Sequence, residues 1–421
     1  METTAGGTRA PGFWRLLGYA ALLGIVGVVA GLVFISITNL GARWYGESGT
    51  GWFEGHPWWI LVAAAAGVLV GLLRRYLHMP DQVPGLIEDL RLEHVDRRAV
   101  PSIVAVSAVS LMGGASLGPE VALGQMGGGG ADLIASRGKL HEDETKALTL
   151  AGMAGAFGGL FSSPFLASFL VLEVSRTALR RFERAFFGSL VASSVSFGLT
   201  FAIAGSIFIG VYEVPSYGYA DWHLLAGVGL GLLAALIVVL LGVVGAVAKS
   251  FFARLQGPAI LKPIIGGLLF GLVGVALPLT NFTGSDQLAV VVEEADDLGA
   301  LLLIATLLGK MVAFVVSTAS GFIGGPIFPV LFMGGTAGTI VHELLPGIPL
   351  GLAFSCMLAA VPGSVVAAPF SMVLLAALFT QVGALETAPI LVAVATASLT
   401  VAGIRAERAR RAEAGNQVVT Q

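Results

Sequence analysis

The stretch that decides the fold of this chain reads GGASLGPEVALGQMGGGG and covers residues 113–130. Its one carboxylate is Glu120, the only acidic side chain between Asp96 and Asp132. A charged side chain at the centre of a membrane costs about 2.5–3.5 kcal/mol, so such an acid predicts a function. The alternative is an acid at the membrane interface that contacts a lipid headgroup or a distant arginine.

The residues before Glu120 favour a helix start. Gly118 and Pro119 precede it, and proline is tolerated in the first helical turn because that turn has no acceptor for its missing amide. The free amides and the positive dipole of such a helix start would surround the Glu120 carboxylate. A site that holds a carboxylate in this way can also hold an anion.

The composition of the whole chain is that of a membrane protein. Of 421 residues, 56% are hydrophobic and 12% are charged, whereas roughly a quarter of a soluble domain is charged. A net charge of -3 argues against a nucleic-acid partner, and the single cysteine, Cys356, cannot form an intrachain disulfide. We therefore predict an all-α, polytopic membrane protein. The sequence has no Cys/His cluster, so we expect no metal and no cofactor.

Several apolar runs are interrupted. The interruptions are Gly113-Gly114, Gly127 to Gly130, Gly324-Gly325-Pro326 and Pro362-Gly363. Broken backbone at membrane depth is tolerated only where it is buried in protein or lines a cavity. These segments therefore predict a transport pathway built from tilted, broken helices.

An internal repeat divides the chain into two halves. Pro57 recurs as Pro263, Asp81-Gln82 recurs as Asp286-Gln287, and Ser163-Pro164-Phe165 recurs as Ala368-Pro369-Phe370, all at nearly one offset. We therefore predict five segments, which are an N-terminal segment 1–14, a first membrane repeat 15–211, a linker 212–221, a second membrane repeat 222–403 and a tail 404–421.

Basic residues predict opposite orientations for the two repeats. Five arginines surround Asp81-Gln82, whereas neither Lys nor Arg occurs between Lys262 and Lys310 around the second copy. Because basic loops stay on the cytoplasmic side, we expect inverted-topology repeats, an architecture of many secondary transporters. In the plasma membrane, both termini would then be cytoplasmic and the linker 212–221 extracellular.

Two motifs carry a resemblance to a known family. The first is Gly118-Pro119-Glu120-Val121-Ala122, followed by Gln125 and a glycine-rich stretch, and the second is Gly324-Gly325-Pro326-Ile327-Phe328-Pro329. Both resemble the signatures of the CLC family of chloride channels and proton-coupled chloride exchangers, over roughly residues 60–400. The resemblance implies a divergent prokaryotic-type member without soluble regulatory domains. It also implies a homodimer in which each subunit has its own pathway for chloride or a similar small anion.

The resemblance implies roles for particular residues. The family's glutamate that matches Glu120 is the gate, which occupies an anion position when ionised and swings out when protonated. Backbone amides would bind the anion, and the candidates here are Gly118, Val121, Ile327 and Phe328. Pro326 offers no amide where the family usually has one.

Departures from the family pattern leave the mechanism open. Val174 stands where the classical exchangers have a proton-relaying glutamate, and the stretch 380–384 lacks the family's inner tyrosine. These departures favour a passive channel, with a proton/anion antiporter for chloride or fluoride as the alternative. Protons are therefore a possible second partner, beside the anion and the lipid bilayer.

Three further residues are candidate pathway groups. Asp81 and Gln82 fall where the family has its inner serine, so they either face the anion or form a solvated cytoplasmic turn. Lys310 lies in an apolar run. It either raises the positive potential along an anion path or forms a structural pair with a carbonyl or carboxylate.

A remote alternative is an intramembrane serine hydrolase. Residues 114–118, with Ser116 at their centre, match the G-x-S-x-G pattern of such enzymes. A nucleophilic serine needs a base within hydrogen-bond reach, and of the six histidines only His342 approaches an apolar segment. We therefore expect that the chain is not an enzyme.

Overall fold

The computed structural model describes residues 11–46, 56–80, 83–205 and 212–419. Within these ranges the chain forms sixteen α-helices, one short 3-10 helix, η1 (Pro278–Thr280), and no strand. Seven of the described helices are long and apolar enough to cross a membrane. The predicted all-α, polytopic membrane fold is confirmed.

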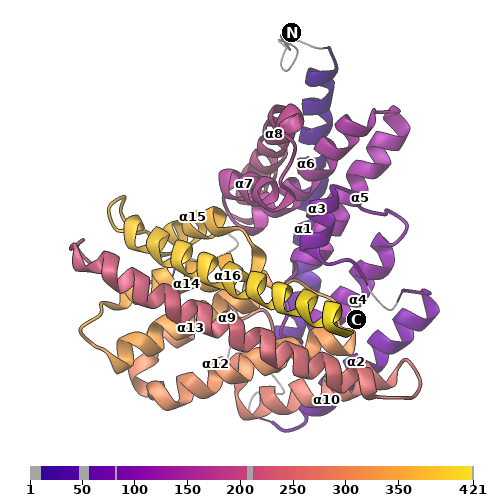
Figure 1. Ribbon diagram of the computed structural model, residues 1–421. Coiled ribbons are helices and arrows are strands. Elements are labelled where there is room, and N and C mark those ends of the chain that lie inside the picture. The colour runs from indigo at the N-terminus through magenta and orange to yellow at the C-terminus, as the bar shows by residue number, and fades with distance from the viewer. Residues whose placement is uncertain (1–10, 47–55, 81–82, 206–211, 420–421) are drawn as a thin grey trace. The chain divides into compact units, whose positions relative to one another are not determined.

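The sixteen described helices form two successive series of eight that match in order. Figure 1 colours the helices along the chain from indigo to yellow. The first series is α1 (Pro11–Tyr45), α2 (Trp59–Tyr76), α3 (Leu86–Leu92), α4 (Val100–Met112), α5 (Glu120–Gly138), α6 (Glu142–Leu160), α7 (Pro164–Ser175) and α8 (Leu179–Ala204). The second series is α9 (Trp222–Arg254), α10 (Leu261–Ala276), α11 (Ser285–Glu293), α12 (Ala295–Ser320), α13 (Ile327–Leu344), α14 (Leu350–Val366), α15 (Pro369–Thr380) and α16 (Thr387–Val419). The repeated prolines Pro164 and Pro369 begin α7 and α15, which have 12 residues each.

Contacts divide the chain into two compact units. The first unit comprises Met1–Gly210, Val247–Asp286 and Leu308–Pro329, and the second comprises Val211–Ala246, Gln287–Leu307 and Val330–Gln421. The first unit thus contains α10 and the starting turn of α13, although both belong to the second series. Because the first unit includes these parts of the second series, both glycine motifs lie in it.

Helices α2 and α10, which are equivalent members of the two series, run antiparallel in the first unit. Gly67 lies against the backbone of Pro263, Gly71 against that of Ile260, and Gly267 against that of Ala63. Residue numbers therefore rise along α2 as they fall along α10. The predicted inversion is confirmed for this pair, and glycine permits the close approach of the two backbones.

In each unit, a glycine also lets the first helix of a series pack closely against the last helix of the same series. In the first unit, Gly24 of α1 lies against the carbonyl of Ala192 in α8. In the second unit, Gly231 of α9 lies in the same way against the carbonyl of Ala393 in α16. The two series thus repeat a packing contact as well as the order of their helices.

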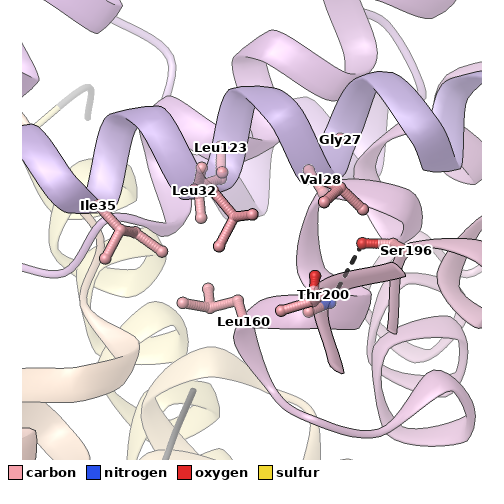
Figure 2. Close-up of a pocket in the computed structure, with 11 residues that line it drawn as sticks. Gly27, Val28, Leu32, Ile35, Leu123, Leu160, Ser196 and Thr200 are labelled. Carbon is pink, nitrogen blue, oxygen red and sulfur yellow. Dashed lines mark hydrogen bonds between the residues drawn. The ribbon is translucent and has the colours of Figure 1, made fainter. Parts of the chain in front are cut away.

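A small cavity in the first unit is lined by residues of α1, α5, α6 and α8 (Figure 2). Its lining is mainly apolar, with Leu32, Leu123 and Leu160 among the residues drawn, and the Gly159 amide donates a hydrogen bond to the Ser196 hydroxyl at 3.3 Å. No charged residue is among its described lining residues. We therefore do not assign an anion to this cavity.

Two of the four predicted helix interruptions are wrong. Helix α5 continues through Gly127 to Gly130, and α14 continues through Pro362 and Gly363. Gly127 lies against the carbonyl of Gly152 in α6, so its lack of a side chain serves helix packing. The breaks at Gly113-Gly114 and Gly324-Gly325-Pro326 are confirmed, because they separate α4 from α5 and α12 from α13.

The terminal helices extend past the expected boundaries of the repeats. Helix α1 begins at Pro11, before the boundary expected at residue 15, and α16 continues to Val419, beyond residue 403. The expected linker at 212–221 lies between α8 and α9. The assignment of each segment to one side of the membrane stays a prediction.

Candidate functional site

The two glycine motifs meet in the first unit. The Gly118 amide donates to the Gly325 carbonyl at 2.8 Å, and the Gly325 amide donates to the Gly118 carbonyl at 2.7 Å. This antiparallel bridge joins residues more than 200 positions apart. It holds the starts of α5 and α13 side by side.

Glu120 lies in the cradle formed by these two helix starts. It is the first residue of α5 and has no exposed surface. Its Oε1 atom accepts a hydrogen bond from the Phe328 amide at 3.0 Å, and the Ile327 amide also faces the carboxylate. A methyl group at Gly118 or Gly325 would overlap this carboxylate, so the cradle depends on both glycines.

One Glu120 oxygen has no hydrogen-bond partner among the described residues. This atom is Oε2. A buried ionised carboxylate is stable only where it is hydrogen-bonded or paired, whereas a protonated one carries no charge that needs compensation. The cradle therefore bonds one carboxylate oxygen to backbone amides and leaves the other without a bonded partner among the described residues.

Three of the four predicted anion-binding amides lie at the two helix starts. The Ile327 and Phe328 amides face Glu120. Val121 lies in the first turn of α5, where helix geometry leaves an amide without an intrahelical acceptor. The Gly118 amide is different, because its hydrogen is used by the Gly325 carbonyl and is not available to an anion in this arrangement.

A cavity lies beside the cradle, and its lining includes Pro119, which precedes Glu120, and Phe328, whose amide bonds to the Glu120 carboxylate. It has a volume of about 110 Å³, and all its lining residues belong to the first unit. Its polar lining residues are Thr38, Asn39, Thr283, Ser285 and Asp286. Glu120 itself does not line the cavity and is fully buried, so in this structure the carboxylate is closed off from it.

Lys310 stabilises one wall of that cavity. The side chain has no exposed surface. Its Nζ atom donates to the carbonyls of Thr280, Asn281 and Phe282 at 3.1, 3.2 and 2.9 Å. These bonds favour the structural alternative for Lys310, since they fix the segment that places Phe282 in the cavity lining.

The remaining predicted residues do not add to this site. Asp81 and Gln82 lie outside the described residues. Ser116 is buried, and its hydroxyl has no hydrogen-bond partner among the described residues, so no base is bonded to it. His342 contacts the carbonyl of Ile348 through Nδ1 at 2.8 Å. These positions weaken the hydrolase alternative.

Sequence reasoning missed a second buried carboxylate. Asp89 of α3 is 5% exposed, and the Gln125 side-chain amide donates to its Oδ2 atom at 2.5 Å. Helix α3 is not among the membrane-spanning candidates. Burial raises the pKa of Asp89 to about 7, while the hydrogen bond from Gln125 acts in the opposite direction. Asp89 and Gln125 are 36 positions apart, so no local pattern indicates the contact.

Asp89 should make the stability of the protein depend on pH. Because its folded pKa lies above its unfolded value, folding favours the protonated form, and stability falls as pH rises from about 4 to about 7. We expect Asp89→Asn to be more stable than the parent by about 4 kcal/mol at pH 8 and close to it at pH 4. Thermal unfolding of the solubilised protein at several pH values measures this. Asp297→Asn, at an exposed position, is the control, and equal profiles for all three proteins would contradict the expectation.

Ser110 is a second contact that the sequence did not indicate. Its hydroxyl accepts a hydrogen bond from the Ile323 amide at 3.1 Å. Ile323 directly precedes the second glycine motif. Helix α4 therefore helps to position the segment that leads to Gly325.

This fold and site define a class of protein, the polytopic membrane proteins in which broken helices converge on a buried carboxylate. A model of the voltage-gated chloride channel family matches residues 66–402. The chain therefore belongs to this family, the CLC family of anion transport proteins, as the motif resemblance predicted.

Curated relatives span most of the chain. A chloride/fluoride channel protein of Pseudomonas syringae pv. tomato is 28% identical over 353 residues, which are 79% of this chain and 74% of the relative. YfeO of Escherichia coli, provisionally described as an ion-transport protein, is 27% identical over 348 residues, which are 79% of this chain and 80% of the relative.

Solved structures share the fold. A slow cyanobacterial Cl⁻/H⁺ antiporter aligns with a TM-score of 0.78 at 20% identity and covers 93% of this chain and 95% of its own. A CLC-type fluoride/proton antiporter aligns with a TM-score of 0.74, also at 20% identity, over 92% and 94% of the two chains. At this identity the likeness concerns the fold alone.

Proposed function

We propose that this protein carries chloride or a similar small anion across the membrane and that protonation of Glu120 opens its pathway. The observation that carries the proposal is the buried Glu120 carboxylate between two helix starts, bonded to the Phe328 amide. Helix starts attract anions through their free amides and positive dipole. A carboxylate in that position takes the place that a transported anion would need.

Protonation is the event that frees this place. An ionised Glu120 and a small anion compete for the same amides, because both are negative and both accept hydrogen bonds. A protonated carboxyl group interacts less with the positive helix ends, so it can leave for the cavity lined by Pro119 and Phe328. Anion flux should therefore rise as pH falls.

The test is Glu120→Gln, which keeps the size of the side chain and removes its charge. We expect anion efflux from proteoliposomes to persist in this variant and to lose its dependence on pH. Glu294→Gln, an exposed glutamate in the second series, is the matched control and should keep the pH dependence of the parent. Unchanged pH dependence in Glu120→Gln would refute the gate.

A passive channel is the first form of this function. Val174, at the position of the exchangers' relay acid, is buried and apolar, so it can hold no proton. A relative that bears the name chloride/fluoride channel protein agrees with this form.

Exchange of the anion for protons is the second form. Asp89 favours it, because a buried carboxyl group on α3 contacts α5, the helix that begins with Glu120. The two similar solved structures are also antiporters. Proton uptake measured together with chloride and fluoride efflux distinguishes the two mechanisms. Proton movement coupled to anion efflux indicates an exchanger, and anion efflux without it indicates a channel.

We also propose the placement of the chain in the cell membrane. The repeats 15–211 and 222–403 would form the membrane region, with the linker 212–221 outside and the segments 1–14 and 404–421 in the cytoplasm. Two copies would form a homodimer with one pathway in each subunit. Accessibility of single cysteines introduced at the exposed positions Glu213 and Arg405, in a Cys356→Ser background, tests the two sides.

A further inference from the structure

A second large cavity lies in the first unit, where α2 ends and α10 begins. It has a volume of about 560 Å³ and is open to solvent. Its walls come from the last turn of α2, from the connection between α9 and α10, and from the end of α12. It shares no lining residue with the cavity beside Glu120.

The lining of this second cavity is strongly basic. It includes Arg74, Arg75, His78 and Lys262, and no acidic residue is among its described lining residues. Arg74 donates to the carbonyls of Gly321 at 3.3 Å and Pro80 at 2.9 Å, so neutral acceptors orient its guanidinium group. The start of α10 beside Lys262 adds the positive end of a helix dipole. The cavity therefore has the charge to attract a phosphate group.

An apolar crevice adjoins the basic cavity. It is lined by Gly71, Leu72, Pro258 and Ile260, and it shares Arg75 and Ala259 with the basic cavity. Helices α2 and α10 carry exposed leucines further along, among them Leu69 at 51% and Leu272 at 56%. In a membrane these leucines face hydrocarbon, so the crevice leads from lipid toward the basic groups.

We propose that this cavity and its crevice bind an anionic phospholipid, with the phosphate beside Arg75 and Lys262 and an acyl chain along Leu72 and Ile260. Basic pockets between membrane helices are suited to anionic headgroups. A free phosphate ion would use the basic groups alone and would leave the apolar crevice without an occupant. The combination of the two surfaces therefore selects a lipid. This proposal does not depend on the gating role of Glu120.

The test measures lipid retained by the purified full-length protein, by native mass spectrometry after exchange with phosphatidylglycerol or phosphatidylcholine. We expect preferential retention of phosphatidylglycerol. Arg75→Gln and Lys262→Gln should each weaken it about fivefold, and the double variant about 25-fold, because each basic residue contributes separately. Phosphatidylcholine binding should change little.

Arg91→Gln is the matched control, since Arg91 is exposed on α3 and does not line the cavity. It should retain phosphatidylglycerol as the parent does. Equal losses in the control and the cavity variants would overturn the proposal, because they would indicate a diffuse charge effect. Displacement of the lipid by inorganic phosphate at equal concentration would also overturn it, since the site would then recognise the ion without the acyl chain.

Discussion

Replacing Gly325 by alanine is expected to lower anion flux by at least about tenfold and to remove its dependence on pH. The added methyl group would occupy the space of the Glu120 carboxylate. Gly325 also forms both hydrogen bonds of the bridge to Gly118, so its backbone cannot move away without breaking that bridge. The methyl group would therefore displace Glu120 and fill the place that an anion needs. Efflux of chloride from proteoliposomes at low and high pH measures both effects.

Gly198→Ala is the matched control for this prediction. No atom lies close to the place of its added methyl group, and alanine is favoured over glycine inside a helix such as α8. This variant should transport anions like the parent. If Gly325→Ala keeps both the flux and its pH dependence, the cradle around Glu120 is not the site of transport.

Lys310→Met is expected to destabilise the protein by about 3–5 kcal/mol. The substitution keeps the length of the side chain but leaves the buried carbonyls of Thr280, Asn281 and Phe282 without the donor that they share. Removing the buried Lys310 charge also removes the free-energy cost of its desolvation, but this gain offsets only part of the loss. We expect the midpoint of thermal unfolding to fall by roughly 5 °C or more in detergent.

The control for Lys310 is Lys249→Met, which makes the same change at an exposed position of α9. It should leave the unfolding midpoint within about 1 °C of the parent, as surface substitutions usually do. Lys310→Arg keeps a positive donor and should lose less stability than Lys310→Met. Equal midpoints for Lys310→Met and Lys249→Met would show that the three carbonyl contacts contribute little.

Local chemistry explains why the sequence predicts much of this fold. Gly118 and Pro119 mark a helix start, and α5 does begin at Glu120. Proline at residues 164 and 369 likewise begins two equivalent helices. These signals can be interpreted without tertiary information, because proline and glycine restrict or free the backbone wherever they occur.

Glycine alone does not distinguish a helix break from a helix contact. Gly127 to Gly130 were expected to break a helix, but they lie inside α5, where Gly127 contacts the backbone of Gly152. Glycine is needed there because the neighbouring helix α6 packs too closely for a side chain. A single sequence does not contain the position of this neighbour.

The same limit applies to the candidate site. The carbonyl partners of Lys310 belong to residues about 30 positions earlier, and the partner of Asp89 belongs to another helix. The sequence is compatible with two roles for Lys310, and no pattern in it indicates that Asp89 is buried against Gln125. Contacts of this kind depend on the packing of helices that are distant in the chain.

The order of residues is enough to establish a helical membrane protein with a repeated pattern and an acid at a broken helix. Apolar length, proline and glycine act locally, so they specify which segments enter the bilayer and where helices begin. The pairing of Gly118 with Gly325 and the bond from the Phe328 amide to Glu120 are visible only in the folded protein. Hydrogen bonds between distant segments form only when the chain brings their atoms within about 3 Å, and that distance is a property of the folded molecule.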